Sequence, residues 1–277
     1  MISLQRERSA QAVPDKFRGA KKQVKDVELL RAYREVLRGN QAFVPFQATF
    51  WKTAKTQLKK ESCGKCAYCE ANTDVVAHGD VEHYRPKSVY WWLAYTYDNY
   101  LYVCQICNQV YKSDHFPIAS PALFGGPPLG AHTSDAALQQ LAGLISPDPV
   151  TTQAEYSLVR YQQEHAREKA LLLNPYFDAP AQYFAYEADD VTQEVTLVPT
   201  SPRYRKHIKA AEDFYGLNRL ELRNLRYKIY LTFRNLKRAL GNLTDEGIKA
   251  DIRHQLQAMQ ANEYVFAGMN RYFNTQF

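Results

Sequence analysis

Apolar residues recur at helical spacing in several stretches of the chain. Residues 26–39 (DVELLRAYREVLRG) carry them on one face and end at Gly39, which predicts an amphipathic helix. Residues 47–60 form a second helical stretch that is rich in lysine. Residues 201–240 and 244–275 predict two or more further helices. Both ends of the chain are therefore expected to be helical.

Turn-forming residues and short spacings between apolar residues dominate the middle of the chain. Residues 61–118 are turn-rich and hold a cluster of possible metal ligands. Residues 119–150 are punctuated by Pro and Gly, which indicates a long loop or linker around a short helix. Residues 165–200 predict a loop followed by at least one strand, EVTLVP. The chain thus divides into a basic helical segment 1–60, a core 61–118, and a linker with a mostly helical region, 119–277.

Composition places the chain among ordinary globular proteins. Of its 277 residues, 45% are hydrophobic and 23% are charged, which excludes a disordered, collagen-like or fibrous protein. No stretch approaches the roughly 20 apolar residues that a membrane span needs. The amino-terminal residues MISLQRERSAQ lack the apolar core of a signal peptide, so a cytoplasmic location is expected.

Charge is distributed unevenly along the chain. Residues 1–60 hold 14 Lys and Arg against 5 Asp and Glu, and residues 201–240 hold 11 against 3. Residues 61–200 hold 7 against 17, so two basic flanks surround an acidic middle. Basic segments of this kind suit a polyanion such as nucleic acid, whereas solvated helix faces are the ordinary alternative.

All five cysteines lie in one short part of the chain. Cys66 and Cys69 form one C-x-x-C pair, and Cys104 and Cys107 form another after 34 intervening residues. Each pair can place two thiolates on one tight turn, and two such turns complete the tetrahedron that zinc prefers. A disulfide framework would spread its cysteines over a short secreted chain, and redox chemistry needs only one pair. The spacing predicts structural zinc, with Cys63 as a spare thiol or a competing ligand.

The segment between the two cysteine pairs carries the side chains of a one-metal nuclease. Glu82 and His83 are adjacent, Asn99 precedes the second pair, and Asn108 follows it directly. Phosphodiester hydrolysis needs a water activated by a base of near-neutral pKa, which histidine supplies, and a hard cation at the scissile phosphate. Magnesium accepts one or two protein oxygen ligands, which Glu82 and Asn108 can provide. Asp80, two residues before Glu82, can assist them.

At these residues the sequence resembles the HNH endonuclease family. The motifs that carry the resemblance are CAYCE, DVEHYRPKS, YDNYLYVCQICNQVYK and FP, and they are closest to the HNH proteins found with Septu and retron anti-phage systems. A looser likeness continues through LLLNPYFD and YGLNRLELRN. The resemblance implies an α+β fold, with a zinc-braced ββα-metal core between helical amino- and carboxy-terminal segments.

The resemblance also implies a role for each residue of the constellation. His83 would be the general base, and Glu82 and Asn108 would be ligands of a catalytic Mg²⁺ or Mn²⁺. Asn99 would fix the loop that orients the base. Many relatives have Asp where this chain has Glu82.

Other residues have a functional and a structural interpretation. The candidates for contact with nucleic acid are four lysines, Lys59, Lys60, Lys87 and Lys112. Solvation is the alternative for Lys87 and Lys112. His115 is either an extra ligand or a loop histidine. The run 90–102 (YWWLAYTYDNYLY) can stack on bases, although packing against a small zinc core is the expected role.

These patterns lead to one main hypothesis and one rival. The main hypothesis is a metal-dependent endonuclease that cuts DNA in defence against phage, with Zn²⁺ as a structural cofactor. The resemblance adds an ATPase of a defence system as a partner. The rival is a zinc-stabilised module that binds nucleic acid or docks a partner without catalysis, and it would tolerate the loss of Glu82 and His83.

Overall fold

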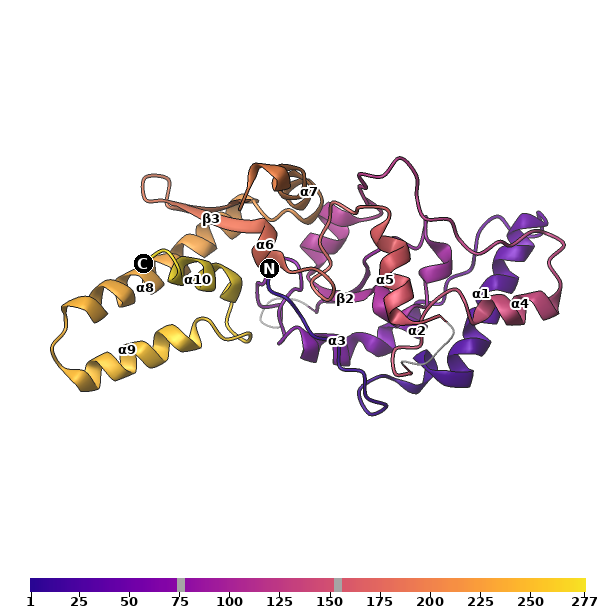
Figure 1. Ribbon diagram of the computed structural model, residues 1–277, viewed down its shortest axis with the longest axis horizontal. Helices are drawn as coiled ribbons and strands as arrows, with labels where there is room; N and C mark the ends of the chain where they lie inside the picture. Colours follow the sequence, from indigo (N-terminus) through magenta and orange to yellow (C-terminus); the bar gives the residue numbers. More distant parts are fainter. Residues whose placement is uncertain (74–77, 152–155) are drawn as a thin grey trace.

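The computed structural model describes residues 1–73, 78–151 and 156–277 (Figure 1). Its α-helices are α1 (Gly19–Leu37), α2 (Ala48–Trp51), α3 (Lys55–Glu61), α4 (Asp135–Ala142), α5 (Leu158–Ala166), α6 (Pro180–Tyr183), α7 (Arg205–Tyr215), α8 (Leu220–Asn242), α9 (Glu246–Ala258) and α10 (Ala267–Asn274). Short 3-10 helices are η1 (Asp15–Phe17), η2 (Lys52–Ala54), η3 (Trp91–Leu93), η4 (Tyr97–Asn99) and η6 (Pro202–Tyr204), and η5 (Ile106–Lys112) is a π-helix. No helix within the described ranges is long and apolar enough to cross a membrane.

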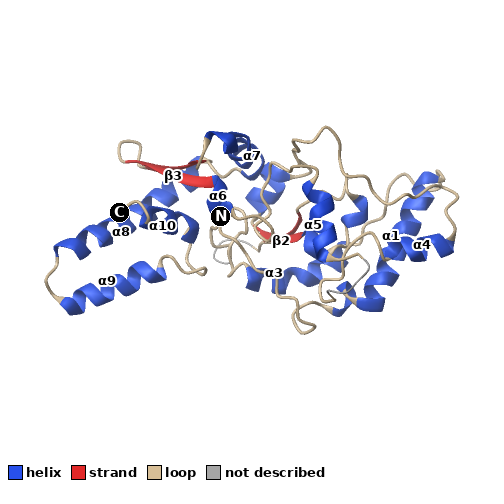
Figure 2. Cartoon of the chain, viewed as in Figure 1, coloured by secondary structure: helices blue, strands red, loops and turns tan. Residues whose placement is uncertain are grey.

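Strands form two small antiparallel sheets, which confirms a mixed α+β protein (Figure 2). In the first sheet, β1 (Asp80–His83) pairs with β2 (Tyr100–Val103), and His83 lies opposite Tyr100. In the second, β3 (Phe184–Asp189) pairs with β4 (Glu194–Pro199). The first sheet is followed directly by η5, so strand, strand and helix come in the order that a ββα unit requires.

The predicted helices are present, with one shifted boundary. The helix expected over 26–39 ends as predicted, before Gly39, whose φ of +77° suits glycine. It begins earlier, at Gly19, and in this added part the Lys22 ammonium donates to Asp26 at 2.6 Å and to the Ser146 carbonyl at 3.0 Å. These contacts bury Lys22 and Asp26, whereas the rest of the first turn is exposed.

The two ends of the molecule are built from different parts of the chain. In Figure 1, α8, α9 and α10 gather at one end, while α1 and α4 pack together at the other. The cysteine-rich segment and the first sheet lie between them.

The expected helix within 119–150 is α4, whose first turn is capped by the Ser134 hydroxyl accepting from the Ala137 amide at 3.2 Å.

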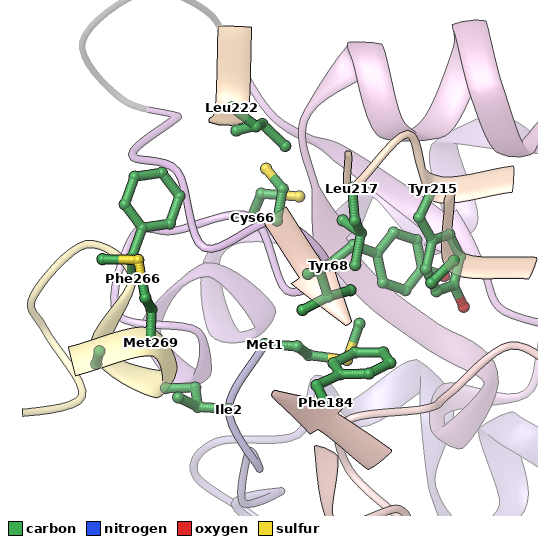
Figure 3. Packing of buried hydrophobic residues seen from close by; sticks show 14 of the residues in the cluster. Met1, Ile2, Cys66, Tyr68, Phe184, Tyr215, Leu217, Leu222, Phe266 and Met269 are labelled. Atoms are coloured by element: carbon green, nitrogen blue, oxygen red, sulfur yellow. The ribbon is translucent and has the colours of Figure 1, made fainter. Parts of the chain in front are cut away.

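One hydrophobic cluster joins all three of the segments expected from the sequence. Figure 3 shows Met1, Phe184 and Leu217 close to Tyr68, and Phe266 beside Met269 at the left of the same cluster. Tyr68 is fully buried and stacks on Tyr215 with ring centroids 3.7 Å apart. Segments 1–60, 61–118 and 119–277 therefore contribute side chains to a common core.

The aromatic run at 90–102 is packed in the interior. Tyr90, Tyr97 and Tyr100 are each no more than 1% exposed. Phe17 packs edge-on against Tyr100 with ring centroids 5.7 Å apart. Burial of these tyrosines is confirmed, but the expected packing against a small zinc core is wrong for them, because they belong to two hydrophobic clusters separate from the one that holds the cysteines.

Candidate metal centre and active site

Four cysteine sulfurs converge where the sequence spacing predicts. Cys66 and Cys69 lie on the turn before β1, Cys104 follows β2, and Cys107 lies in η5. The Ala67 amide donates to the Tyr102 carbonyl at 2.9 Å, which ties the first turn to β2. All four sulfur atoms lie within 4.8 Å of one another. This arrangement can hold a metal ion, and four thiolates around a closed centre fit structural zinc.

A guanidinium lies against the cysteine cluster. Arg219 Nη1 donates to Cys107 Sγ at 3.6 Å, and its Nη2 donates to Cys69 Sγ at 3.9 Å. Hydrogen bonds from the neighbouring thiols lower the pKa of Cys69 well below its usual value, and the charge of Arg219 lowers it further. Arg219 therefore favours the thiolate form that binds metal. Sequence reasoning missed this role, although Arg219 lies within the YGLNRLELRN motif.

Cys63 and His115 stand apart from this cluster. Cys63 is half-buried with φ of +55°, and burial raises the pKa of its thiol. His115 is exposed, and its ring packs on Phe214 at 5.0 Å. Across the described residues, the only group of three or more potential metal ligands is the set of four cysteines, so the spare-thiol interpretation of Cys63 fits the geometry.

A second, more open site lies beside the first sheet. Glu82 and His83 from the end of β1 and Asn108 from η5 line one pocket of about 330 Å³. Lys87, from the loop after β1, lines the same pocket. The structure thus brings the adjacent Glu82 and His83 together with Asn108, which lies far from them in the sequence.

His83 has a defined tautomer. Its Nε2 lies 2.9 Å from the Ala94 carbonyl, which can only accept, so Nε2 carries the proton and Nδ1 keeps a lone pair. Burial lowers the pKa of His83 to about 3, with smaller contributions from the charges of Lys87 and Lys112. The ring packs edge-on against Trp51 and Tyr100 at 4.8 and 5.1 Å. His83 is therefore a neutral imidazole in a fixed orientation, which a general base needs, but its pKa is lower than the near-neutral value expected from the sequence.

Glu82 is buried beside a buried cation. Its Oε1 lies 2.5 Å from Lys112 Nζ, which also donates to the His83 carbonyl at 3.1 Å. Burial raises the pKa of Glu82, and the charge of Lys112 opposes this effect. Within the described residues Oε1 accepts no well-directed hydrogen bond, so the carboxylate retains capacity for a further partner.

This geometry corrects one expectation from the sequence. Lys112 was expected to contact nucleic acid, but its side chain is 0% exposed and its ammonium faces Glu82. A buried ammonium held by a carboxylate and a carbonyl cannot reach a phosphate in this arrangement. Lys112 instead balances charge within the candidate site.

Asn99 connects the two ends of the loop between β1 and β2. It is fully buried, its Oδ1 accepts from the Arg85 amide at 2.8 Å, and its Nδ2 donates to the Arg85 and Leu93 carbonyls at 3.0 and 3.3 Å. Leu93 is next to Ala94, whose carbonyl holds His83. The amide thus fixes the backbone that orients the imidazole.

Asn108 is oriented by Asp80. Its Nδ2 donates to Asp80 Oδ2 at 3.1 Å, and Gln109 Nε2 donates to the same oxygen at 2.9 Å. Because a carboxylate only accepts, the Asn108 amide must present its nitrogen to Asp80 and keeps Oδ1 for another partner. Asp80 assists by orientation.

The remaining candidate lysines lie at or near the surface. Lys60 is exposed and Lys59 is half-buried, both in α3. Lys87 is half-buried, and its Nζ lies 5.8 Å from the centroid of the Trp51 ring. Contact of these three lysines with nucleic acid stays a prediction.

Internal ion pairs use part of the basic flank 1–60. Arg6 pairs with Glu61 at 2.9 Å, and Arg8 pairs with Asp98 at 2.6 Å. Arg34 reaches Asp135 at 2.7 Å. The acidic middle of the chain therefore neutralises part of the positive charge that the sequence count assigns to this flank.

Comparison with known proteins identifies a relative of this chain. No protein-family model matches this chain. It is similar to the Septu protein PtuB of Bacillus mycoides (strain KBAB4), with 27% identity over 198 residues. The similar region covers 67% of this chain and 53% of that protein, so the chain spans about half the length of this curated relative. The similarity connects the chain with a Septu protein, whereas the chemistry rests on the geometry of the two sites.

Proposed function

We propose that this protein is a metal-dependent endonuclease of the HNH type that hydrolyses phosphodiester bonds in DNA. The observation that carries the proposal is the pocket in which a neutral, oriented His83 lies beside Glu82 and Asn108. The cysteine cluster next to this pocket supplies the bracing that two short strands need, because an isolated two-stranded sheet is marginal in water.

In this proposal His83 takes a proton from the attacking water at Nδ1. The Ala94 carbonyl holds Nε2–H throughout, so the lone pair is presented in one direction. Burial keeps the imidazole neutral before the transfer.

The same pocket has suitable ligands for a divalent cation. Glu82 and the Oδ1 of Asn108 would hold Mg²⁺ or Mn²⁺, which prefer oxygen ligands and neutralise charge on the scissile phosphate when bound. Lys112 would then share the Glu82 carboxylate with that ion. Zn²⁺ would be held separately by Cys66, Cys69, Cys104 and Cys107.

The biological setting follows from similarity. The likeness to a Septu protein and the sequence resemblance to Septu and retron HNH proteins support a role in defence against phage. The sequence resemblance also supports a defence-system ATPase as a partner. DNA remains the proposed substrate, with Lys59, Lys60 and Lys87 as candidate contacts.

The test is cleavage of plasmid DNA by the purified protein, with and without added Mg²⁺. We expect nicking or linearisation that depends on Mg²⁺ and is lost in His83→Ala. The matched control is His254→Ala, which removes an exposed histidine from α9. Equal cleavage by His83→Ala and wild type would refute the proposal and favour the non-catalytic zinc module.

A further inference from the structure

A larger cavity of about 480 Å³ lies behind the strand that carries His83. Tyr84 and Arg85, the two residues after His83, form part of its wall. Three further aromatic side chains, Tyr161, Phe177 and Tyr183, line it as well. A cavity of this size and composition is typical of sites that bind a small ligand with a flat apolar part.

The mouth of the cavity is strongly basic. Lys169, Arg203 and Lys206 line it with exposed side chains, and within the described ranges none of the three forms an ion pair. Asp178 is the one carboxylate among the lining residues, and burial raises its pKa. Three unpaired cations on one rim favour a ligand with several negative charges.

The interior of the cavity wall holds buried polar groups whose hydrogen bonding is incomplete. His165 is 3% exposed, and its Nδ1 donates to the Tyr161 carbonyl at 2.8 Å, so its Nε2 keeps a lone pair that has no partner among the described residues. Asn174 is 2% exposed, and its Nδ2 likewise has no acceptor. One acceptor and one donor are the groups that the polar edge of a nucleobase pairs with.

We propose that this cavity binds a nucleoside polyphosphate. The base would lie between the aromatic walls, with its edge toward His165 and Asn174, and the phosphates would lie at Lys169, Arg203 and Lys206. Binding needs neither a metal at Glu82 nor nuclease activity, so the proposal stands or falls independently of the proposed function. Because Tyr84 and Arg85 directly follow β1 and line the cavity, an occupant would lie close to the segment that carries the candidate base.

Isothermal titration of the full-length chain with each of the four ribonucleoside triphosphates, without added divalent metal, tests the proposal. We expect saturable binding of at least one of them. The matching nucleoside and inorganic tripolyphosphate should each bind at least about tenfold more weakly, because charge-assisted hydrogen bonds and base contacts each contribute. Tripolyphosphate that binds as tightly as the nucleotide would overturn the assignment of a base site.

Substitutions of residues that line the cavity test whether the nucleotide binds there. Lys206→Glu should weaken it by about tenfold or more, because a favourable contact with phosphate becomes a repulsive one. Arg205→Glu is the matched control, since Arg205 is an exposed neighbour on α7 outside the cavity lining. Ala166→Trp places bulk at an exposed helical position on the lining and should abolish binding without disturbing the core. Failure of all four nucleotides to bind, or unchanged binding in Lys206→Glu and Ala166→Trp, would overturn the proposal.

Discussion

The cysteine cluster and the Glu82–His83 pocket share the first sheet and η5, yet they differ in the kind of side chains they use and in how open they are. The cluster is closed, with four like ligands whose sulfurs lie within 4.8 Å of one another. The pocket is open and uses three different side chains, together with the buried cation of Lys112. A closed site of identical ligands suits a structural role, whereas an open polar site leaves room for a substrate.

The largest effect is expected from the loss of one zinc ligand in the closed site. Cys104→Ser should release zinc and unfold the segment 61–118, because structural zinc supplies about 10–16 kcal/mol of apparent binding free energy in small sites. Metal analysis of the purified variant and its thermal unfolding curve are the measurements. Cys63→Ser is the matched control and should keep one zinc per chain. Zinc retained at full stoichiometry in Cys104→Ser would contradict the ligand set.

The open site should respond differently, because its residues lie outside the zinc ligand set and their proposed role is in the chemistry of cleavage. His83→Ala should lower the rate of DNA cleavage by about 10²–10⁴-fold, the usual contribution of a general base, and should leave zinc bound. Glu82→Ala and Asn108→Ala should also lose activity, but part of it should return at high Mg²⁺ or with Mn²⁺. Cleavage rates across a metal titration measure this contrast.

Recovery of cleavage activity at a high metal concentration distinguishes a metal ligand from a general base. A weakened ligand set can be saturated by more metal, whereas a missing base cannot be replaced in this way. Recovery of His83→Ala by Mn²⁺ to the same extent as Glu82→Ala would show that the two residues share one role. Loss of zinc from any of the three variants would show that the two sites are not separate.

The sequence predicted the closed site well because its geometry is local. Two C-x-x-C pairs determine where the sulfurs of Cys66, Cys69, Cys104 and Cys107 can point, and the structure places them as expected. Burial of the Tyr-rich run 90–102 was also predictable, because large aromatic side chains gain much from burial. Its partners were not, since Tyr97 and Tyr100 pack on Phe17 and not on the cysteine cluster.

The open site could be predicted only in part, because distant contacts determine its electrostatics. Lysine is rarely buried, so the position of Lys112 beneath Glu82 has no signal in the sequence. The tautomer of His83 depends on the Ala94 carbonyl, 11 residues further along the chain. Arg219 lies 150 residues from Cys69. Such contacts depend on the complete fold.

Arg219 gives the next prediction, of intermediate size. Arg219→Gln should weaken zinc binding by about 10–100-fold, as the loss of an outer partner of metal ligands typically does. The reason is that the guanidinium offsets the negative charge of the thiolates. Competition with a chromophoric chelator measures the affinity. Arg223→Gln, a change in α8, which begins directly after Arg219, removes an ion pair with Glu194 and should leave zinc affinity unchanged.

The smallest expected effect concerns pH and distinguishes the buried His83 from an ordinary histidine. An imidazole with an unperturbed pKa near ~6.5 would make activity fall as the pH drops through that value. Burial lowers the pKa of His83 to about 3, so His83 itself should contribute no such fall between pH 5 and pH 8. Initial rates of cleavage over this range, at saturating metal, provide the measurement.

The same pKa shift should appear in the stability of the fold. The unfolded chain binds a proton at His83 near pH ~6.5 and the folded chain does not, so this contribution to stability is present above pH ~6.5 and is lost as the pH falls toward 3. The free energy of unfolding should therefore decrease by about 1.4 kcal/mol per pH unit below that point on account of His83. His83→Gln, whose amide can still donate to the Ala94 carbonyl, removes the titration. The difference in unfolding free energy between wild type and His83→Gln, measured by urea denaturation from pH 7 to pH 5, should decrease, and its slope should approach this value toward pH 5. A difference that stays constant with pH would mean that His83 is solvated in the folded protein, and the pocket would then lose its resemblance to a site with a pre-oriented neutral base.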